Sequence, residues 1–379
     1  MKNKVLFLTN YPAPYRVDFF NEWGKQVDLT VLFFESTTEQ THRSQEWFDK
    51  QYENFTAVFL SKNIRFRRKK LCTDVIKYLK KEWDMIISGG YAEPTQMLAF
   101  TWLKHHHKSF FLEMDGGLTK EENIFQRTIK QHFISMPTGW ISSGKATNQY
   151  LLYYGAQEKK IEFYPFTSLK EGDFAETEKR KKIKKSDLKT KLGISEDKVI
   201  ISVGRFSYKR GYGKGFDLLI RLALELDKQT GVYIIGDEPT QEFMEMKKEN
   251  KITNIHFIEF KQKDELLDYY LAADLFVLLT REDVWGLVIN EAMMCRLPVI
   301  TTNRCGAGLN LITNEKNGYI VPTDNYIDVL AIIKDVLPND RMLKFIGNNG
   351  FDTIRNYTIE EMVKSHNKIL TNKQSTEGA

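Results

Sequence analysis

The sequence predicts an α/β protein of two domains, each built on a parallel β-sheet. Short, nearly continuous apolar runs recur along the chain and alternate with helical patterns, as expected of strands that are buried on both faces. The length of 379 residues is too great for one ordinary hydrophobic core and fits two domains of comparable size.

The first half of the chain alternates strands and helices. A helix is expected from about Val17, and residues 140–166 have the order strand, helix, turn, strand. The other predicted strands of this half are Lys4–Asn10, Leu29–Phe34, Met85–Gly90 and Ser109–Gly117.

The second half contains the most informative segment, Arg281–Val299 (REDVWGLVINEAMMCRLPV). The apolar run Leu271–Leu279 before it predicts a buried strand, and a helix is expected from Gly286. Pro298 ends that helix, because a proline moves the preceding residue out of the helical region, and a further strand follows. Ligands of such βαβ units bind beyond the carboxyl ends of the strands, which places Asp283 at the ligand crevice.

The acidic and glycine residues of this segment suit a sugar nucleotide. Carboxylates such as Asp283 and Glu291 accept hydrogen bonds from the hydroxyls of a sugar or a ribose. The backbone N–H groups of Gly286, Leu287 and Val288 would face a diphosphate at the positive end of the helix. The alternative is that Asp283 only caps the helix and that Glu291 is solvated.

A basic, glycine-rich loop upstream supplies the opposite charge. It follows the predicted strand Val199–Gly204 and contains Arg205, Lys209, Arg210 and Lys214. Fixed cations there would stabilise the negative charge that develops on a diphosphate leaving group. The candidate phosphate lysine is Lys214 or Lys209, and the alternative is a solvated loop.

In their order and spacing these motifs resemble the nucleotide-sugar half of the retaining, two-domain glycosyltransferases of family 4, also called group 1. The family's signature is a Glu, seven residues and a second Glu. Here Asp283 takes the first position and Glu291 the second. Arg205 and Lys214 match the family's GR…KG pair, with more residues than usual between them. The resemblance is strongest over residues 141–322.

This resemblance implies the GT-B fold, in which two Rossmann-like domains face each other across a deep cleft. It also implies sugar transfer with retention at the anomeric carbon. Arg205 and Lys214 would hold the donor phosphates. No Asp-x-Asp motif is present, so we expect no metal and no cofactor, and the nucleotide-sugar is a co-substrate. The residues that would contact the nucleoside, by their position in the family, are Glu291, Phe260, Lys261, Gly236 and Asp237.

The first domain would bind the acceptor, in two loops that follow strands at the crevice. One loop contains Tyr15 and Arg16, and the other contains Glu113, Asp115 and Gly116. Arg16 either contacts a phosphate or the acceptor, or is an ordinary surface arginine. Asp115 would accept a hydrogen bond from the acceptor hydroxyl or contact the donor sugar, in a region where many relatives have a functional histidine. The alternative for Asp115 is a simple Asp-Gly turn.

The domain boundaries follow from changes in composition along the chain. We expect an acceptor-binding domain over residues 1–168 and a nucleotide-sugar-binding domain over residues 197–351. Residues 169–196 are highly charged and poor in apolar side chains, which is typical of an exposed interdomain connection. Residues 352–373 are expected to form a helix that packs back on the first domain.

Composition also bounds the cellular setting. The net charge of +5 gives no support to a nucleic-acid partner. Three cysteines without metal-ligand spacing suit a reducing cytoplasm, and no apolar run approaches the roughly eighteen residues that span a bilayer. We therefore expect a cytoplasmic protein. The basic segment Lys62–Lys70 and the aromatic-rich segment Phe100–Phe111 either contact an anionic inner-membrane surface or are solvated.

The predicted activity is transfer of a sugar from a nucleotide-sugar donor to a glycan or lipid-linked glycan, in the synthesis of bacterial cell-surface polysaccharide. Two alternatives stay open: a nucleotide-sugar epimerase or hydrolase of the same fold, and a non-catalytic GT-B partner subunit of a transferase. The shorter side chain of Asp283 leaves room for the non-catalytic alternative, while its retained charge favours an active enzyme.

Overall fold

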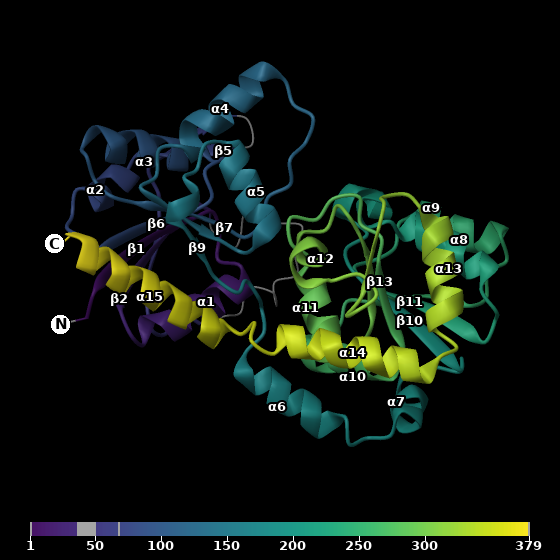
Figure 1. The fold of residues 1–379 in the computed structure, drawn as a ribbon. Coiled ribbons are helices and arrows are strands. Elements are labelled where there is room, and N and C mark those ends of the chain that lie inside the picture. The colour runs from purple at the N-terminus through teal and green to yellow at the C-terminus, as the bar shows by residue number, and fades with distance from the viewer. Residues whose placement is uncertain (1, 36–50, 67–68, 378–379) are drawn as a thin grey trace. The chain divides into compact units, whose positions relative to one another are not determined.

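The computed structural model describes residues 2–35, 51–66 and 69–377. The chain forms two compact units (Figure 1): unit 1 comprises residues 1–168 and 357–379, and unit 2 comprises residues 169–356. Each unit is built on one parallel sheet with helices packed against it, which confirms the predicted α/β class.

The sheet of unit 1 has seven parallel strands in the order β3-β2-β1-β6-β7-β8-β9. Its strands are β1 (Lys4–Thr9), β2 (Asp28–Phe33), β3 (Thr56–Phe59), β6 (Met85–Gly89), β7 (Phe111–Met114), β8 (Gly139–Ser142) and β9 (Ile161–Phe163). A separate antiparallel hairpin consists of β4 (Asn63–Phe66) and β5 (Lys69–Cys72). The helices are α1 (Pro14–Gly24), α2 (Val75–Leu79), α3 (Pro94–His105), α4 (Ile124–Ile134), α5 (Lys145–Tyr153) and α15 (Ile359–Glu377), with a 3-10 turn at Glu158–Lys160.

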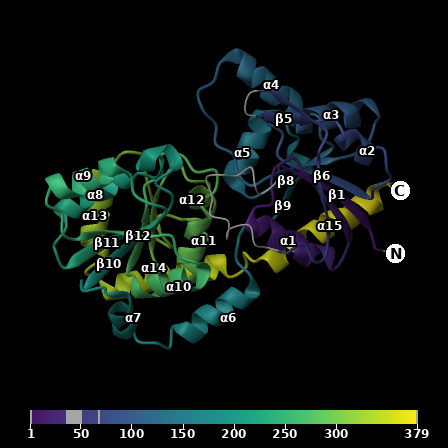
Figure 2. The same ribbon diagram turned by 180° about the vertical axis from the view of Figure 1, so that it is seen from behind.

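The C-terminal helix α15 belongs to unit 1, although the rest of unit 1 ends near residue 168. It packs beside α1, as both views of the ribbon show (Figures 1 and 2). Asn367 fixes the two helices together: its amide oxygen accepts a hydrogen bond from Trp23 Nε1 at 2.8 Å, and its amide nitrogen donates to Gln26 at 2.6 Å. The last helix is therefore part of the core of the first unit.

The sheet of unit 2 has six parallel strands in the order β12-β11-β10-β13-β14-β15. Its strands are β10 (Lys198–Val203), β11 (Thr230–Gly236), β12 (Ile255–Glu259), β13 (Leu275–Leu278), β14 (Val299–Thr302) and β15 (Tyr319–Val321). The helices are α6 (Glu171–Arg180), α7 (Lys185–Leu192), α8 (Phe216–Glu225), α9 (Gln241–Glu249), α10 (Lys263–Ala272), α11 (Leu287–Met294), α12 (Gly306–Leu311), α13 (Tyr326–Val336) and α14 (Asp340–Ile354), with a 3-10 segment, η4, at Tyr208–Lys214.

Several elements differ from the sequence-based predictions. Leu271 and Ala272 end α10 and do not begin a strand, because the buried face of that helix runs directly into the apolar residues of β13. The charged segment 169–196 contains α6 and α7. These helices lie within unit 2, where Arg180 and Lys185 bind acidic residues of that unit. Toward the C-terminus, α14 continues to Ile354 and the last helix begins only at Ile359.

The two segments considered for membrane contact have different outcomes. In Phe100–Phe111 the side chains of Phe100 and Phe110 are fully buried in the core of unit 1, so the prediction that this aromatic segment faces a membrane is wrong. The basic segment Lys62–Lys70 runs through the β4–β5 hairpin, with residues 67 and 68 outside the described ranges. Within the described residues, no helix is both long and apolar enough to cross a membrane.

An arginine ends α11 in a conformation that glycine usually adopts. Arg296 has φ 59°, in the left-handed region, just after the helix. Its guanidinium stacks on the ring of Phe351 at 3.5 Å and binds Glu178 at 2.9 Å. These contacts compensate the backbone strain and connect α11 to α14 and α6.

We expect Arg296→Gly to leave unit 2 more stable than Arg296→Ala. Both substitutions remove the same side-chain contacts, but only glycine also relieves the left-handed strain, which costs other residues about 1 kcal/mol. Chemical denaturation of the two variants measures this difference. Equal stabilities would show that the backbone at residue 296 is not strained.

Candidate functional site

Unit 2 brings three of its loops together at one edge of its sheet. Strands β10, β13 and β14 are parallel neighbours, so the loops that follow them share the carboxyl edge. These loops contain Arg205, Asp283 and Cys305 respectively. The arrangement is the one predicted for a βαβ ligand site.

The basic loop after β10 has a constrained backbone. Lys209, Arg210 and Gly211 all have positive φ within η4, and Gly215 is left-handed at the start of α8. A β-carbon on Gly215 would lie 2.1 Å from the carbonyl oxygen of Leu279, at the end of β13. Only glycine permits this close approach, which brings the loop against the strand that leads to Asp283.

Lys214 and Asp283 form an ion pair across this edge. They are 69 residues apart in sequence, and their side chains are 16% and 18% exposed. Lys209, the other candidate phosphate lysine, is 57% exposed and lies 3.6 Å from Glu282. The geometry therefore favours Lys214 as the cation at the centre of the site, while Arg205 and Lys209 lie at its exposed rim.

Arg281 clamps the basic loop, a role that sequence reasoning missed. Its guanidinium binds both carboxylate oxygens of Asp217 at 2.8 Å and the carbonyl oxygen of Tyr212 at 2.5 Å. Its backbone N–H donates to the carbonyl of Gly213 at 3.0 Å, and Thr280 donates to the same oxygen. Both side-chain and backbone hydrogen bonds thus fix the loop that ends in Lys214 to the residues after β13.

The amino end of α11 lies beside the Lys214–Asp283 pair. Gly286 has φ 97°, and no side chain of the described chain caps the helix that starts at Leu287. The first amides of a helix, here Leu287 and Val288, lack intrahelical partners and form a positive end. A β-carbon on Gly286 would lie 2.8 Å from the sulfur of Cys305, so this turn also requires glycine.

The turn after β14 is pinned to the same segment. Gly306 N–H donates to the carbonyl of Asp283 at 3.0 Å, and a β-carbon on Gly306 would lie 2.0 Å from the carbonyl of Val284. Burial raises the pKa of the Cys305 thiol to about 12, so the sulfur stays protonated, and it donates a hydrogen bond to the carbonyl of Trp285 at 3.1 Å.

Glu291 lies in the second turn of α11, held by a buried tyrosine. Tyr270 donates a hydrogen bond to Glu291 Oε2 at 2.9 Å. Burial, followed by the negative charge of Glu291, raises the pKa of Tyr270, so its hydroxyl remains a donor. Tyr270 could not be identified from sequence, because it lies in a different helix, α10, and only the fold brings it to Glu291.

The residues proposed for the nucleoside lie at the ends of β11 and β12. Gly236 approaches the carbonyl of Gly204 so closely that a β-carbon would lie 1.8 Å from that oxygen. The carboxylate of Asp237 accepts hydrogen bonds from the backbone of Phe206 and Ser207, so it holds the basic loop in place. Phe260 is 48% exposed, and Lys261 follows it in the same loop.

In unit 1 the predicted acceptor residues form a buried ionic cluster. Arg16 binds Glu113 through Nη1 and Asp115 through Nη2. Glu113 also binds His366 Nε2 of α15 at 2.7 Å, and Tyr164 donates to Asp115 at 2.7 Å. We call Arg16, Glu113, Asp115 and His366 the tetrad.

The exposure of the tetrad corrects one alternative for Arg16. Its side chain is only 5% exposed, and those of Glu113 and His366 are 0% exposed, so Arg16 is not a surface arginine. Only Asp115, at 24%, is open to solvent. Tyr15 packs edge-on against Phe166, and Gly116 is buried. His366 and Tyr164 were missed, because nothing in their local sequence indicates the cluster.

The electrostatics of the two carboxylates differ. Burial alone would raise the pKa of Glu113, but the charges of Arg16 and His366 lower it to about 2. Burial raises the pKa of Asp115, and the neighbouring charge of Glu113 adds to this effect, against the opposing action of Arg16 and Tyr164. Glu113 is therefore an anion at neutral pH, while the pKa of Asp115 lies above its ordinary value.

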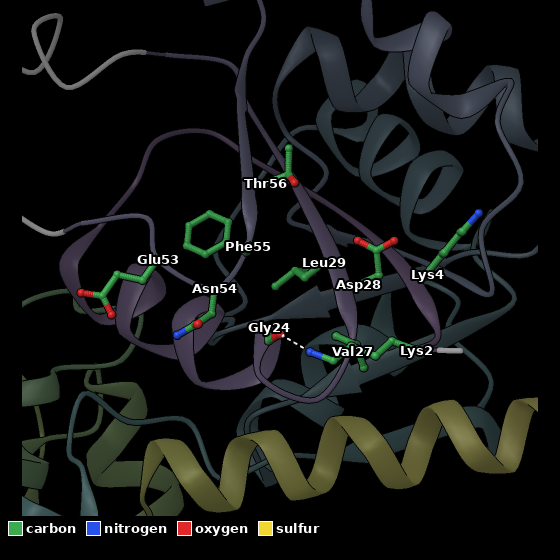
Figure 3. A pocket seen from close by; sticks show the side chains of 10 residues that line it. All are labelled: Lys2, Lys4, Gly24, Val27, Asp28, Leu29, Glu53, Asn54, Phe55 and Thr56. Carbon is green, nitrogen blue, oxygen red and sulfur yellow. Dashed lines mark hydrogen bonds between the residues drawn. The ribbon is translucent and has the colours of Figure 1, made fainter.

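A separate hollow of about 660 Å³ lies at the opposite edge of the unit 1 sheet. Figure 3 shows Lys4, Asp28 and Thr56 around it, at the amino ends of β1, β2 and β3. None of the predicted site residues lines it. Within the described residues, no cluster of three or more His, Cys, Asp or Glu side chains is arranged to hold a metal ion.

Comparison with known proteins agrees with the geometry of unit 2. Residues 184–353 match the family model described as glycosyl transferases group 1. This part of the chain is therefore similar to the group 1 glycosyltransferases. The matched region includes Arg205, Lys214, Asp283 and Glu291, so the residues that suggested the resemblance lie in the domain that matches.

Curated relatives match part of the chain. An uncharacterized glycosyltransferase of Methanocaldococcus jannaschii is 26% identical over 157 residues, 41% of this chain and 44% of that protein. The lipopolysaccharide glucosyltransferase WaaG of Escherichia coli is 27% identical over 118 residues, 31% of each chain. The chain thus spans about half, or less, of the length of the curated relatives it matches.

Solved structures extend the likeness to the whole fold. The crystal structure of HepE from Anabaena in complex with UDP has a TM-score of 0.76 at 15% identity, over 97% of this chain and 100% of that one. The structure of WaaG has a TM-score of 0.67 at 14% identity, over 97% and 99% of the two chains. These likenesses confirm the GT-B fold class.

We expect Glu113→Gln to destabilise unit 1 by about 3–5 kcal/mol at pH 7, because it leaves the buried cations of Arg16 and His366 under-compensated. A carboxylate whose pKa is lowered on folding contributes stability above its unfolded pKa and loses it as the pH falls. The difference from wild type should therefore shrink from about pH 5 toward pH 2. Unfolding free energies measured against pH test this; a pH-independent difference would contradict it.

Proposed function

We propose that the protein is a retaining glycosyltransferase that moves a sugar from a nucleotide-sugar to a glycan or lipid-linked glycan. The observation that carries the proposal is the Lys214–Asp283 pair beside the amino end of α11, with Glu291 one turn further along that helix. A cation and uncapped amides suit a diphosphate, and two carboxylates suit sugar and ribose hydroxyls.

The chemistry that fits this site is electrostatic. The bond between the anomeric carbon and the diphosphate oxygen breaks, and an acceptor hydroxyl forms a new bond to that carbon on the same face. The hydroxyl proton passes to the departing phosphate. Lys214 and the amides of Leu287 and Val288 stabilise the charge that develops on the phosphate, which lowers the barrier without a covalent intermediate.

The choice of donor and pathway rests on the relatives. HepE was crystallised with UDP and with UDP-glucose, which supports a uridine nucleotide as the first donor to test. WaaG acts on lipopolysaccharide, and CapM of Staphylococcus aureus, 24% identical over 150 residues, is a capsular polysaccharide glycosyltransferase. These names support an acceptor in cell-surface polysaccharide synthesis.

The geometry of the proposed donor site predicts that Lys214 contributes more to UDP binding than Lys209. Replacing Lys214 with alanine should weaken UDP binding roughly 10- to 100-fold, as expected when a charge-assisted hydrogen bond of about 1.5–3 kcal/mol is lost. Lys209→Ala, the matched control in the same loop, should change the affinity less than threefold. Calorimetric titration with UDP, GDP, dTDP and CMP, each with EDTA and with magnesium, measures both effects and identifies the base.

The same titrations distinguish the alternatives. Binding that requires magnesium would contradict a metal-independent site. Consumption of UDP-glucose without an acceptor would favour the epimerase or hydrolase, and binding without any turnover would favour a non-catalytic partner subunit. If none of these nucleotides binds, the proposed donor site is wrong.

We also propose a peripheral contact with an anionic inner-membrane surface through the β4–β5 hairpin. Six basic residues lie within Lys62–Lys70, and each charge near anionic lipid contributes about 1 kcal/mol. Changing all six to glutamine should weaken binding to phosphatidylserine-containing vesicles at least tenfold at low salt. The control is a variant with six exposed lysines of unit 2 changed. Unchanged vesicle binding, or an equal loss in the control, would contradict this contact.

A further inference from the structure

The tetrad contains two cations and two anions, and the hydrogen bonds of His366 determine its charge. Nδ1 of His366 lies 2.7 Å from the carbonyl oxygen of Met362, and Nε2 lies 2.7 Å from Glu113 Oε2. Glu113 is a fixed anion, so both ring nitrogens face acceptors. Both must therefore donate, and the ring is an imidazolium.

The surroundings of the ring suit a cation. The rings of Phe19, Trp23 and Tyr164 lie 4.8, 5.0 and 5.3 Å from that of His366. Aromatic faces attract cations, and the ring is shielded from water. The tetrad is thus electrically neutral, with Arg16 and His366 balancing Glu113 and Asp115, which is the condition for burying charges at moderate cost.

The two oxygens of Glu113 contact different cations of the tetrad. Glu113 gives one oxygen to Arg16 and the other to His366, and it therefore does not take both nitrogens of the guanidinium. The second guanidinium nitrogen of Arg16 is left for Asp115. Since carboxylates favour two-point contacts with arginine, a Glu113 without His366 would compete for that nitrogen.

Asp115 is held through one oxygen only. Arg16 and Tyr164 both donate to Oδ1, and Oδ2 has no hydrogen-bond partner among the described residues. The side chain is 24% exposed and follows β7 at the carboxyl edge of the unit 1 sheet. A carboxylate oxygen with this exposure can accept a hydrogen bond from a sugar hydroxyl.

We propose that His366, on the C-terminal helix, is a positioning residue for Asp115. By occupying Oε2 of Glu113, it directs Arg16 to Asp115, and Arg16 together with Tyr164 presents Oδ2 of Asp115 to a sugar hydroxyl of the substrate. The inference rests on the proposed function for the identity of that hydroxyl. The positioning itself involves only residues of unit 1: α1, β7, the segment after β9, and α15.

The test follows the titration of the Asp115 carboxyl by NMR of protein labelled with ¹³C at the aspartate side chains, assigned with Asp115→Asn. In His366→Leu, loss of the Arg16 contact should raise the Asp115 midpoint by roughly 1–3 pH units. His366→Gln, whose amide still donates to Glu113, should restore most of the wild-type value. If the leucine variant does not fold, His366→Asn, which is too short to reach Glu113, replaces it.

The matched control is Asn367→Ala, one residue along the same helix. This substitution removes the hydrogen bonds of α15 to Trp23 and Gln26 but leaves the tetrad intact. It should leave the Asp115 midpoint unchanged even where it lowers the melting temperature. An equal shift in Asn367→Ala would overturn the proposal, because His366 would then act only by docking the helix. An unchanged midpoint in folded His366→Leu would also overturn it.

Kinetics connect the positioning to function. With UDP-glucose as the probe donor, His366→Leu should lower kcat at least tenfold. The Kd for UDP, whose proposed site lies in unit 2, should stay within twofold. A changed Kd with unchanged kcat would contradict the proposal. Wild-type protein that neither binds UDP nor consumes UDP-glucose would disprove the proposed function, and the NMR titration would still decide whether His366 positions Asp115.

Discussion

The buried guanidinium of Arg16 is the constraint on which much of unit 1 depends. A charge with 5% exposure must be paired, and its partners come from β7, Glu113 and Asp115. Two anions against one cation would leave a buried negative charge, which His366 removes. Because His366 lies on α15, the last helix of the chain contributes to charge balance in the first unit as well as to its apolar core.

The ionic pair of unit 2 has a different character. Lys214 and Asp283 are 16% and 18% exposed, compared with 0% for Glu113 and His366. A pair that is partly exposed to water is better screened and costs less to open than a fully buried one. The same kind of contact therefore has a structural role in unit 1, while in unit 2 it fits the proposed site, where an arriving diphosphate would replace the carboxylate at the lysine.

The sequence predicted the features that depend on local pattern. The alternation of apolar runs and helices predicted two parallel sheets, and the order of Arg205, Lys214, Asp283 and Glu291 predicted the edge at which three loops meet. The sequence did not reveal the features that depend on packing between segments far apart in the chain. Leu271 and Ala272 are as apolar as a strand yet end α10. The partners Tyr270 and His366 lie outside the quoted motifs, and Arg281 begins one without any local sign of its contacts, so only the folded chain shows which side chains they hold.

The aspartate at position 283 illustrates how a departure from a family pattern can be accommodated. Its side chain is one methylene shorter than glutamate, yet it reaches Lys214, because Gly215 lets the loop approach the carbonyl of Leu279 and Arg281 fixes the loop from the other side. The aspartate thus keeps the charge and hydrogen-bonding capacity of the pair. Because this retained ion pair is what a diphosphate site needs, it favours an active enzyme over a non-catalytic subunit.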